Sequence, residues 1–460
     1  MTALLPGPAP AVEAPEGPPA VRSSSSLVVA GAVALGAVLV LALLVGGGAP
    51  GGEASGLADA GPLVGWGLPV VTLAARMTAL ATIGTLLFAA VLLPGAVLPG
   101  ASRSAVRAAS RWALAWAATT VVQALLTVSE LVGVPPTALT AESVRTFLTH
   151  LPAGDAAVGT LAAATAVAVA AGRCAGSGGA RLLLLIAGAG VVLPAVLTGH
   201  SAAAEDHLLT TTTLAVHVVA ASVWVGGLLA VLVHGRGRDD LSRAAGRFSV
   251  VALGCAAAVG VSGLLAAWLV LSDGPGIGAG LGSGYGLLLI GKTVALGALL
   301  AFGRQHRRRT LPDLGEGRPG AFRRFAAVEV GVMLATVALA VALAASPPPA
   351  AAASTPGPVS APASAGATAA PPPGHDHGDL VVPVLVDPSG FTVTETVAPG
   401  SVVTVHNPTD LDVTVTADDG SFDRVVPAGS LTSFPAPETP GSYPFTSRHD
   451  PAFTGVLVVG

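Results

Sequence analysis

Long apolar stretches separated by short polar segments occupy the first three quarters of this 460-residue chain. An apolar run of about 18 or more residues is long enough to cross a bilayer, because a helix rises about 1.5 Å per residue. We therefore expect residues 26–346 to form an all-α polytopic membrane bundle. The pattern predicts about nine spans, near 26–48, 68–95, 109–133, 156–172, 182–199, 208–233, 248–271, 284–303 and 324–345.

The last 80 residues follow another pattern, in which apolar and polar positions alternate. Segments such as SVVTVHN at 401–407 are bounded by Pro, Gly, Asp or Asn. A period of two is typical of strands with one buried face, so residues 380–460 are predicted to form a small all-β sandwich. Residues 347–379 are a Pro/Ala-rich linker with an HDH tract, and residues 1–25 are a tail expected to be disordered.

Charge is scarce and asymmetrically placed. The chain is 52% hydrophobic and 10% charged, whereas soluble domains are about 25% charged. If the N-terminus is cytoplasmic, the inner segments carry seventeen arginines and the outer loops carry only Arg145. Positively charged loops stay in the cytoplasm. We therefore expect a multi-pass protein of the cytoplasmic membrane, with its N-terminus inside and its C-terminal domain outside the cytoplasm.

One apolar stretch contains the best candidate site. Residues 208–233 carry no charged side chain, so His217 is expected near the middle of the hydrocarbon. An ionisable residue at that depth is costly and usually functional. Thr210, Thr213 and Trp224 share the face of His217 at helical spacing. The sequence therefore predicts a buried imidazole that faces other helices rather than lipid.

Other histidines extend this candidate site toward the outer surface. His200 and His207 flank the short acidic turn SAAAED, and imidazoles with carboxylates suit a borderline metal ion. His207 and His217 are about 15 Å apart along one helix, so they cannot hold one ion together. Either the outer pair passes an ion to His217, or these histidines are unrelated. His375 and His377 of the HDH tract are weaker candidates for copper or zinc.

Two further cationic residues lie within predicted spans. Arg76 and Lys292 are expected at about the depth of His217, where three cationic groups would need an anion or a neutral partner. Alternatively, Arg76 and Lys292 extend toward the outer surface. Glu329, near an inner end, is expected to pair with the Arg323–Arg324 pair.

Several functional classes find no support in the sequence. Cys174 and Cys255 form no cluster and suit no disulfide. There is no Gly-rich nucleotide loop followed by Lys, no aspartyl-phosphate motif and no Ser/His/Asp arrangement. The three methionines are too few for a thioether relay. We therefore expect no enzyme, no ATP-driven pump and no nucleic-acid partner.

Residues 66–310 resemble the CopD/PcoD copper-resistance and copper-uptake membrane family. The resemblance is carried by GH at 199–200, HVVAASVWVGGL at 217–228 and YGLLLIGK at 285–292. It implies that the chain moves copper ions across the cytoplasmic membrane or handles them within it. His200, His207 and His217 would be the ligands, with Arg76, Trp224, Tyr285 and Lys292 as supporting polar residues.

Residues 380–460 resemble a cupredoxin without its copper ligands. A blue-copper centre needs a thiolate and two imidazoles, so none is expected here. His406, His449 and Asp450 leave a weaker copper or zinc site open. The four ligand positions of that family hold other residues: Asp412, Ser447, Asp450 and Phe453.

The function expected from these observations is copper uptake or transfer through a buried histidine site. The partners would be the lipid bilayer and an extracytoplasmic copper-binding protein. One alternative is a haem- or quinone-linked membrane redox protein, since buried histidines also ligate haem. Another is a membrane docking or assembly protein for copper delivery, in which the sandwich recruits the partner.

Overall fold

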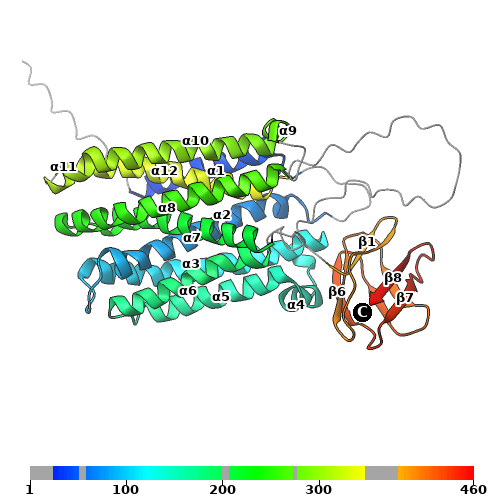
Figure 1. Cartoon of the computed structure of the whole chain (residues 1–460). Coiled ribbons are helices and arrows are strands. Elements are labelled where there is room, and N and C mark those ends of the chain that lie inside the picture. Colours follow the sequence, from blue (N-terminus) through cyan, green and yellow to red (C-terminus); the bar gives the residue numbers. More distant parts are fainter. Residues whose placement is uncertain (1–23, 51–58, 199–206, 273–276, 317, 348–381) are drawn as a thin grey trace, which may run out of the picture.

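The computed structural model describes residues 24–50, 59–198, 207–272, 277–316, 318–347 and 382–460. Nine helices in these ranges are long and apolar enough to cross a membrane, so the predicted polytopic bundle is confirmed. They run side by side, and the β-domain lies beyond one end (Figure 1). The spans are α1 (Ser24–Gly46), α2 (Pro62–Leu87), α3 (Gly100–Val132), α5 (Pro152–Ala171), α6 (Ser177–Leu197), α7 (His207–His234), α8 (Arg238–Ser272), α10 (Gly284–Gln305) and α12 (Pro319–Ala344).

Some helices begin well before the apolar runs that predicted them. Helix α3 begins at Gly100 rather than near 109, and α8 begins at Arg238 rather than near 248. The additional turns contain alanine and arginine, which are good helix formers, and the arginines end the apolar run. The hydrophobic pattern therefore located the apolar part of each helix and missed the part that continues beyond it.

Helix α2 lies at the centre of the bundle. Of its apolar window, 78% is buried, against 50% or less in each other span of the described chain. It crosses α7 where Gly84 faces Gly226. A Cβ atom on Gly226 would lie 2.3 Å from the carbonyl oxygen of Leu80, and one on Gly84 would lie 2.0 Å from that of Gly226. Two glycines therefore allow these backbones to approach closely.

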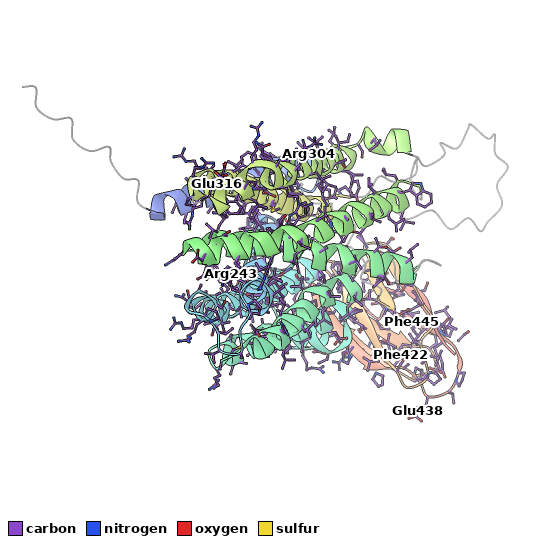
Figure 2. All side chains as sticks on the ribbon, turned by 60° about the vertical axis from the view of Figure 1, so that its left-hand side comes forward. Arg243, Arg304, Glu316, Phe422, Glu438 and Phe445 are labelled. Atoms are coloured by element: carbon purple, nitrogen blue, oxygen red, sulfur yellow. The ribbon has the colours of Figure 1, made fainter. Side chains whose placement is uncertain are left out.

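Arginine side chains satisfy helix ends at the end of the bundle opposite the β-domain, called the inner end below. Arg247 of α8 donates to the carbonyl of Leu92 (3.1 Å), and Arg323 of α12 donates to that of Gly235 (2.8 Å). The last carbonyls of a helix have no partner within it, so these contacts compensate them. Arg243 and Glu316 point outward toward this end (Figure 2). The arginine-rich segments are thus gathered at one end.

Two of the spans continue into π-helical turns at the inner end. They are η1 (Phe88–Leu92), which follows α2, and η4 (His306–Thr310), which follows α10 and leads into the short helix α11 (Leu311–Gly315). Because a π-turn contains an additional residue, it shifts the face on which the following side chains lie, and such turns are frequent at functional sites.

The C-terminal domain is a sandwich of two four-stranded sheets, as predicted. One sheet has the order β2-β1-β3-β6 and the other β5-β4-β7-β8, with β1 and β3 parallel. Valine, phenylalanine and tyrosine side chains from both sheets fill the space between them, including Phe422 and Phe445 (Figure 2). The strands are β1 (Val384–Asp387), β2 (Gly390–Val393), β3 (Val402–Asn407), β4 (Val413–Ala417), β5 (Asp423–Val426), β6 (Ser430–Pro435), β7 (Gly441–Thr446) and β8 (Thr454–Val459).

The sandwich rests on the outer end of the bundle through a short helix. Between the 3-10 turn η2 (Pro136–Ala138) and α5 lies α4 (Ala141–His150), whose first turn is capped by Thr140 accepting from the Ser143 amide (3.1 Å). The polar residue Thr140 therefore fixes the N-terminus of this helix. A second short helix, α9 (Ile277–Leu281), precedes α10.

Apolar and polar contacts both hold the sandwich on α3 and α4. Val132, Phe147 and Leu431 belong to one buried apolar cluster. The buried His406 ring bonds through Nε2 to the carbonyl of Leu131 (2.6 Å), and the exposed pair Arg424–Glu142 lies at 2.6 Å. His406 therefore secures the interface between the two domains.

Candidate functional site

His217 is half-buried on α7 and faces α8. Its Nδ1 lies 3.0 Å from the hydroxyl oxygen of Ser262. Gly263 lies beside the ring, and a Cβ atom there would come within 3.3 Å of Cε1. The ring therefore occupies space that the absence of a side chain at position 263 leaves open. This agrees with the expected orientation of His217 toward neighbouring helices.

The hydrogen bonds define which ring nitrogen of His217 can bind a ligand. The Ser262 hydroxyl donates to the Ala258 carbonyl at 2.5 Å, so its oxygen accepts from Nδ1–H of His217. A neutral imidazole then carries its lone pair on Nε2. Metal-bound histidines usually donate their other N–H in this way, which fixes the ring orientation. The arrangement suits Nε2 as a ligand atom.

Two cationic side chains accompany this histidine. Lys292 of α10 interacts electrostatically with Arg76 of α2 and with His217. Arg76 is exposed at the edge of an otherwise enclosed helix. Among the described residues the buried carboxylate is Glu329, at the inner end, so no buried acidic side chain compensates these charges locally. The three helices thus produce an electropositive site around the imidazole.

The other supporting residues lie nearer than His217 to the outer or the inner end of the bundle. Trp224, two turns beyond His217, is 5% exposed and belongs to the main core of the bundle. Tyr285 is half-buried on α10, two turns before Lys292 and on the same face. Thr213 is buried one turn before His217. Trp224 therefore stabilises the helix packing, while Thr213 and Tyr285 lie toward the outer end.

The predicted outer ligands are not placed by the structure. His200 lies outside the described residues, as do His375 and His377 of the HDH tract. Helix α7 begins at His207, whose side chain is likewise outside the described part. Among the residues that are described, no group of three or more His, Cys, Asp or Glu side chains converges on one point.

The structure corrects the expected partner of Glu329. This carboxylate is 3% exposed and pairs with His306 of η4 at 2.9 Å, rather than with Arg323 and Arg324. His306 does not stand out in the sequence, because three arginines follow it directly and suggest a solvated segment. Its position one helical turn before Thr310 is the signal that identifies it, since His306 and Thr310 are both buried while the arginines between them are exposed.

The altered ligand positions of the sandwich make structural hydrogen bonds. Ser447 is buried and its hydroxyl accepts from the Thr414 amide (3.1 Å), and a carboxylate oxygen of Asp412 accepts from the Ala428 amide (2.8 Å). His449 lies in the β7–β8 loop, where Nδ1 is bonded to the Asp412 carbonyl (2.8 Å). It therefore does not lie on a regular strand.

The cysteines are poor ligands in this setting. Cys174, in the α5–α6 connection, donates from Sγ to the Gly176 carbonyl at 3.3 Å, and burial raises the pKa of its thiol. The thiol therefore stays protonated at neutral pH and binds metal weakly. Cys255 lines a shallow apolar groove between α7 and α8. Neither cysteine is paired in a disulfide.

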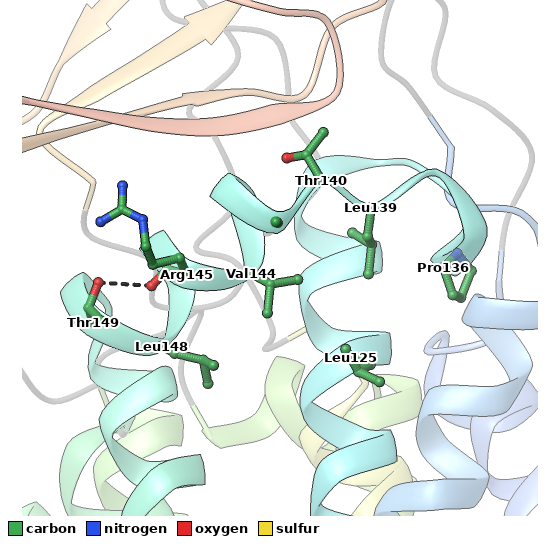
Figure 3. Close-up of a pocket in the computed structure, with 9 residues that line it drawn as sticks. Leu125, Pro136, Leu139, Thr140, Val144, Arg145, Leu148 and Thr149 are labelled. Atoms are coloured by element: carbon green, nitrogen blue, oxygen red, sulfur yellow. Dashed lines mark hydrogen bonds between the residues drawn. The ribbon is translucent and has the colours of Figure 1, made fainter.

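A surface hollow of about 610 Å³ lies between α3 and α4 at the outer end. Leu125, Leu139, Val144 and Leu148 line it, and Arg145 stands at its side (Figure 3). Its lining contains no imidazole, thiol or carboxylate, so it has no metal-ligating side chain. The chemistry of the candidate site therefore remains with the histidines of the bundle.

Comparison with known families assigns both halves of the bundle. Residues 57–210 match the family model described as Copper resistance protein D-like, N-terminal domain, and residues 242–343 match the one described as Copper resistance protein D. Together the two matches cover more than half of the chain. The sandwich lies outside both, and so do residues 211–241, which include His217. No curated protein and no solved structure matches the chain.

Proposed function

Because this chain belongs to the copper resistance protein D family, we propose that it transfers copper ions across the cytoplasmic membrane by way of His217. The observation that carries the proposal is the hydrogen-bonded imidazole of His217, whose Nε2 is left as an acceptor inside the bundle. Imidazole nitrogen binds copper well and is a common metal ligand. Copper is the cargo in this account rather than a resident cofactor.

Lys292 and Arg76 adjust how long the ion stays at His217. Two positive charges near a cation raise its free energy at the site, more strongly in a low-dielectric interior than in water. A transported ion must bind tightly enough to enter and weakly enough to leave. We assign to Lys292 and Arg76 the role of weakening copper binding so that the ion is released.

The predicted outer histidines supply the entry step in this proposal. His200 and His207 receive copper outside the membrane and pass it to His217, about 15 Å further along α7. The arginine-rich end of the bundle corresponds to the cytoplasmic side by the charge rule. The sandwich then lies outside the cytoplasm, where it serves as the docking surface for an extracytoplasmic copper-binding protein.

The haem-linked alternative receives less support from the placement of the imidazoles. Bis-histidine ligation needs two buried rings that face each other. In the described part of the bundle, the other buried rings are His234 and His306, both at the inner end. His234 is seventeen residues, about 25 Å, beyond His217 along α7. An optical spectrum of the purified protein without a Soret band is the expected result.

The test in cells is copper accumulation with the wild type and the His217→Ala variant. We expect the variant to lose most of the accumulation that the wild type produces. His150→Ala is the matched control, because His150 is exposed on α4 and should have no effect. Equal accumulation by wild type and His217→Ala, at equal membrane abundance, would refute the proposal.

A further inference from the structure

A second histidine in the bundle shows the same bonding arrangement as His217. His306 is 8% exposed, and its Nδ1 lies 2.5 Å from the hydroxyl oxygen of Thr310. The Thr310 hydroxyl also lies 3.4 Å from the His306 carbonyl, and when it donates to that carbonyl its oxygen accepts from Nδ1–H. The lone pair of the neutral ring therefore lies on Nε2.

Nε2 of His306 faces a buried carboxylate oxygen. Oε2 of Glu329 lies 2.9 Å away, and Glu329 is 3% exposed. An ordinary ion pair would be closed by a hydrogen bond between these atoms, but neither atom has a hydrogen-bond partner among the described residues. Two acceptors thus lie side by side in a buried position. Buried polar atoms left in this state are rare and call for a cation or a proton between them.

The separation of the two atoms fits two ligands of one metal ion. Imidazole nitrogen and carboxylate oxygen each bind transition metals at about 2.0 Å, so two such ligands at a right angle are about 2.8 Å apart. A hydrogen bond, in contrast, requires that N–H points at the oxygen. His306 Nε2 and Glu329 Oε2 lie close together without such an aligned N–H, as two ligands of one metal ion would.

The surroundings of the pair resemble a metal site in other respects. Thr310 holds the ring through Nδ1, as residues around metal-bound histidines do. The rings of Phe322 and Phe325 lie 5.1 and 5.2 Å from that of His306 and exclude water from its sides. The π-helical turn η4 directs His306 and Thr310 inward, while the arginines between them face outward.

We propose that His306 Nε2 and Glu329 Oε2 form a second copper-binding station at the inner end of the bundle. His306 lies fourteen residues beyond Lys292 on the continuous α10–η4 helix, about 21 Å further inward. An ion that leaves His217 would therefore meet this pair before reaching the cytoplasmic side. The cargo and its route rest on the proposed function, whereas metal binding by the pair does not. Nitrogen and oxygen ligands without thiolate favour a divalent ion, and Cu²⁺ binds such sets most tightly.

The test is Cu²⁺ binding to the purified full-length protein in nanodiscs, measured by equilibrium dialysis and by electron paramagnetic resonance. We expect Glu329→Gln and His306→Gln each to lose one bound equivalent, or to weaken it at least tenfold. His234→Gln is the control, because His234 is equally buried at the same end but contacts the Phe88 ring. Its copper content should equal that of the wild type.

Thr310→Val tests the site in a variant that should still fold, because it keeps both ligands and nearly the same side-chain volume. It should weaken the same equivalent by about 10–100-fold. Wild-type binding in Thr310→Val and in both Gln variants would mean that the pair is an ion pair only, and would overturn the proposal. His217→Ala separates the two proposals. If His217→Ala loses copper while Glu329→Gln does not, the inner station is refuted and the proposed function stands. If Glu329→Gln loses copper while His217→Ala does not, the proposed function is refuted and the inner station stands.

Discussion

At the scale of residues, two histidines of the bundle have the same hydrogen-bonding arrangement. Nδ1 of His217 lies 3.0 Å from the Ser262 hydroxyl oxygen, and Nδ1 of His306 lies 2.5 Å from that of Thr310, an arrangement that suits Nε2 as the acceptor in each ring. The hydroxyls are themselves tied to main-chain carbonyls, so each ring is fixed by a helix backbone. An imidazole fixed in this way binds metal without a further loss of ring freedom.

The Ser262 hydroxyl should therefore contribute to copper affinity although it does not touch the ion. Ser262→Ala removes the acceptor for Nδ1–H, so the ring can rotate and change tautomer. We expect copper affinity to fall about tenfold. Isothermal titration with Cu²⁺ measures it. Ser222→Ala, at a buried serine of α7, is the control and should retain wild-type affinity.

Lys292 should oppose copper binding at His217. Lys292→Met removes a positive charge while keeping the length of the side chain, so the repulsion felt by the cation disappears. We expect tighter binding at the His217 site and slower release, measured as a lower Kd and a smaller dissociation rate. Weaker binding in this variant would show that Lys292 supports the site by holding an anion instead.

The sequence identified His217 and not the inner pair, for a physical reason. His217 interrupts a long run without charge, so its depth follows from counting residues. His306 stands beside three arginines, and a linear pattern cannot show that a π-helical turn separates its face from theirs. The pairing of His306 with Glu329 depends on how α10 packs on α12, which no local pattern contains.

At the scale of elements, α2 and α7 make a close backbone contact where they cross. Gly226 lies between the two family matches, at 57–210 and 242–343, and its missing side chain permits this crossing. Arg76 lies on α2 two turns before Gly84, and it interacts electrostatically with Lys292, which in turn interacts with His217 on α7. The glycine therefore supports the site through packing.

Gly226→Ala should destabilise the protein. The new Cβ atom would lie 2.3 Å from a main-chain carbonyl oxygen, so the two helices must separate. We expect a loss of about 1–3 kcal/mol in the free energy of unfolding, as for other overpacked cores. A lower midpoint in a thermal or denaturant unfolding curve would show it. Gly246→Ala on α8 is the control, since nothing lies within 4 Å and alanine favours the helix.

The strands show where sequence patterns fail for single elements. Alternation is clear in β3 and β4 but not in β5 and β7. Strand β5 contains Asp423 and β7 contains Pro444, and both residue types are depleted in strands. Pairing stabilises these two strands: β5 pairs with β4, and β7 pairs with β4 and β8.

At the scale of the whole molecule, the number of spans could be predicted from the sequence, but the contact between the sandwich and the bundle could not. The count of apolar runs and the distribution of arginine suffice for nine spans with the sandwich at the end opposite the arginines. The contact between Arg424 and Glu142 joins residues 282 positions apart, so no local sequence pattern predicts it. Only the folded chain reveals that His406 contacts Leu131 across this interface.

The interface should depend on His406 far more than on the surface ion pair. His406→Ala leaves the buried carbonyl of Leu131 without this hydrogen bond, which costs about 1–3 kcal/mol. Arg424→Gln breaks a half-exposed pair worth about 0–1 kcal/mol. Hydrogen–deuterium exchange should therefore increase in α4 and β6 for His406→Ala and stay near wild type for Arg424→Gln. The reverse order would contradict this account of the interface.

The most direct measurement is copper flux into liposomes that contain only the purified full-length protein. The account predicts copper entry with the wild type, a loss of at least about tenfold with His217→Ala, and unchanged entry with the surface variant His150→Ala. Equal flux through wild type and His217→Ala would contradict the claim that copper passes by way of this imidazole.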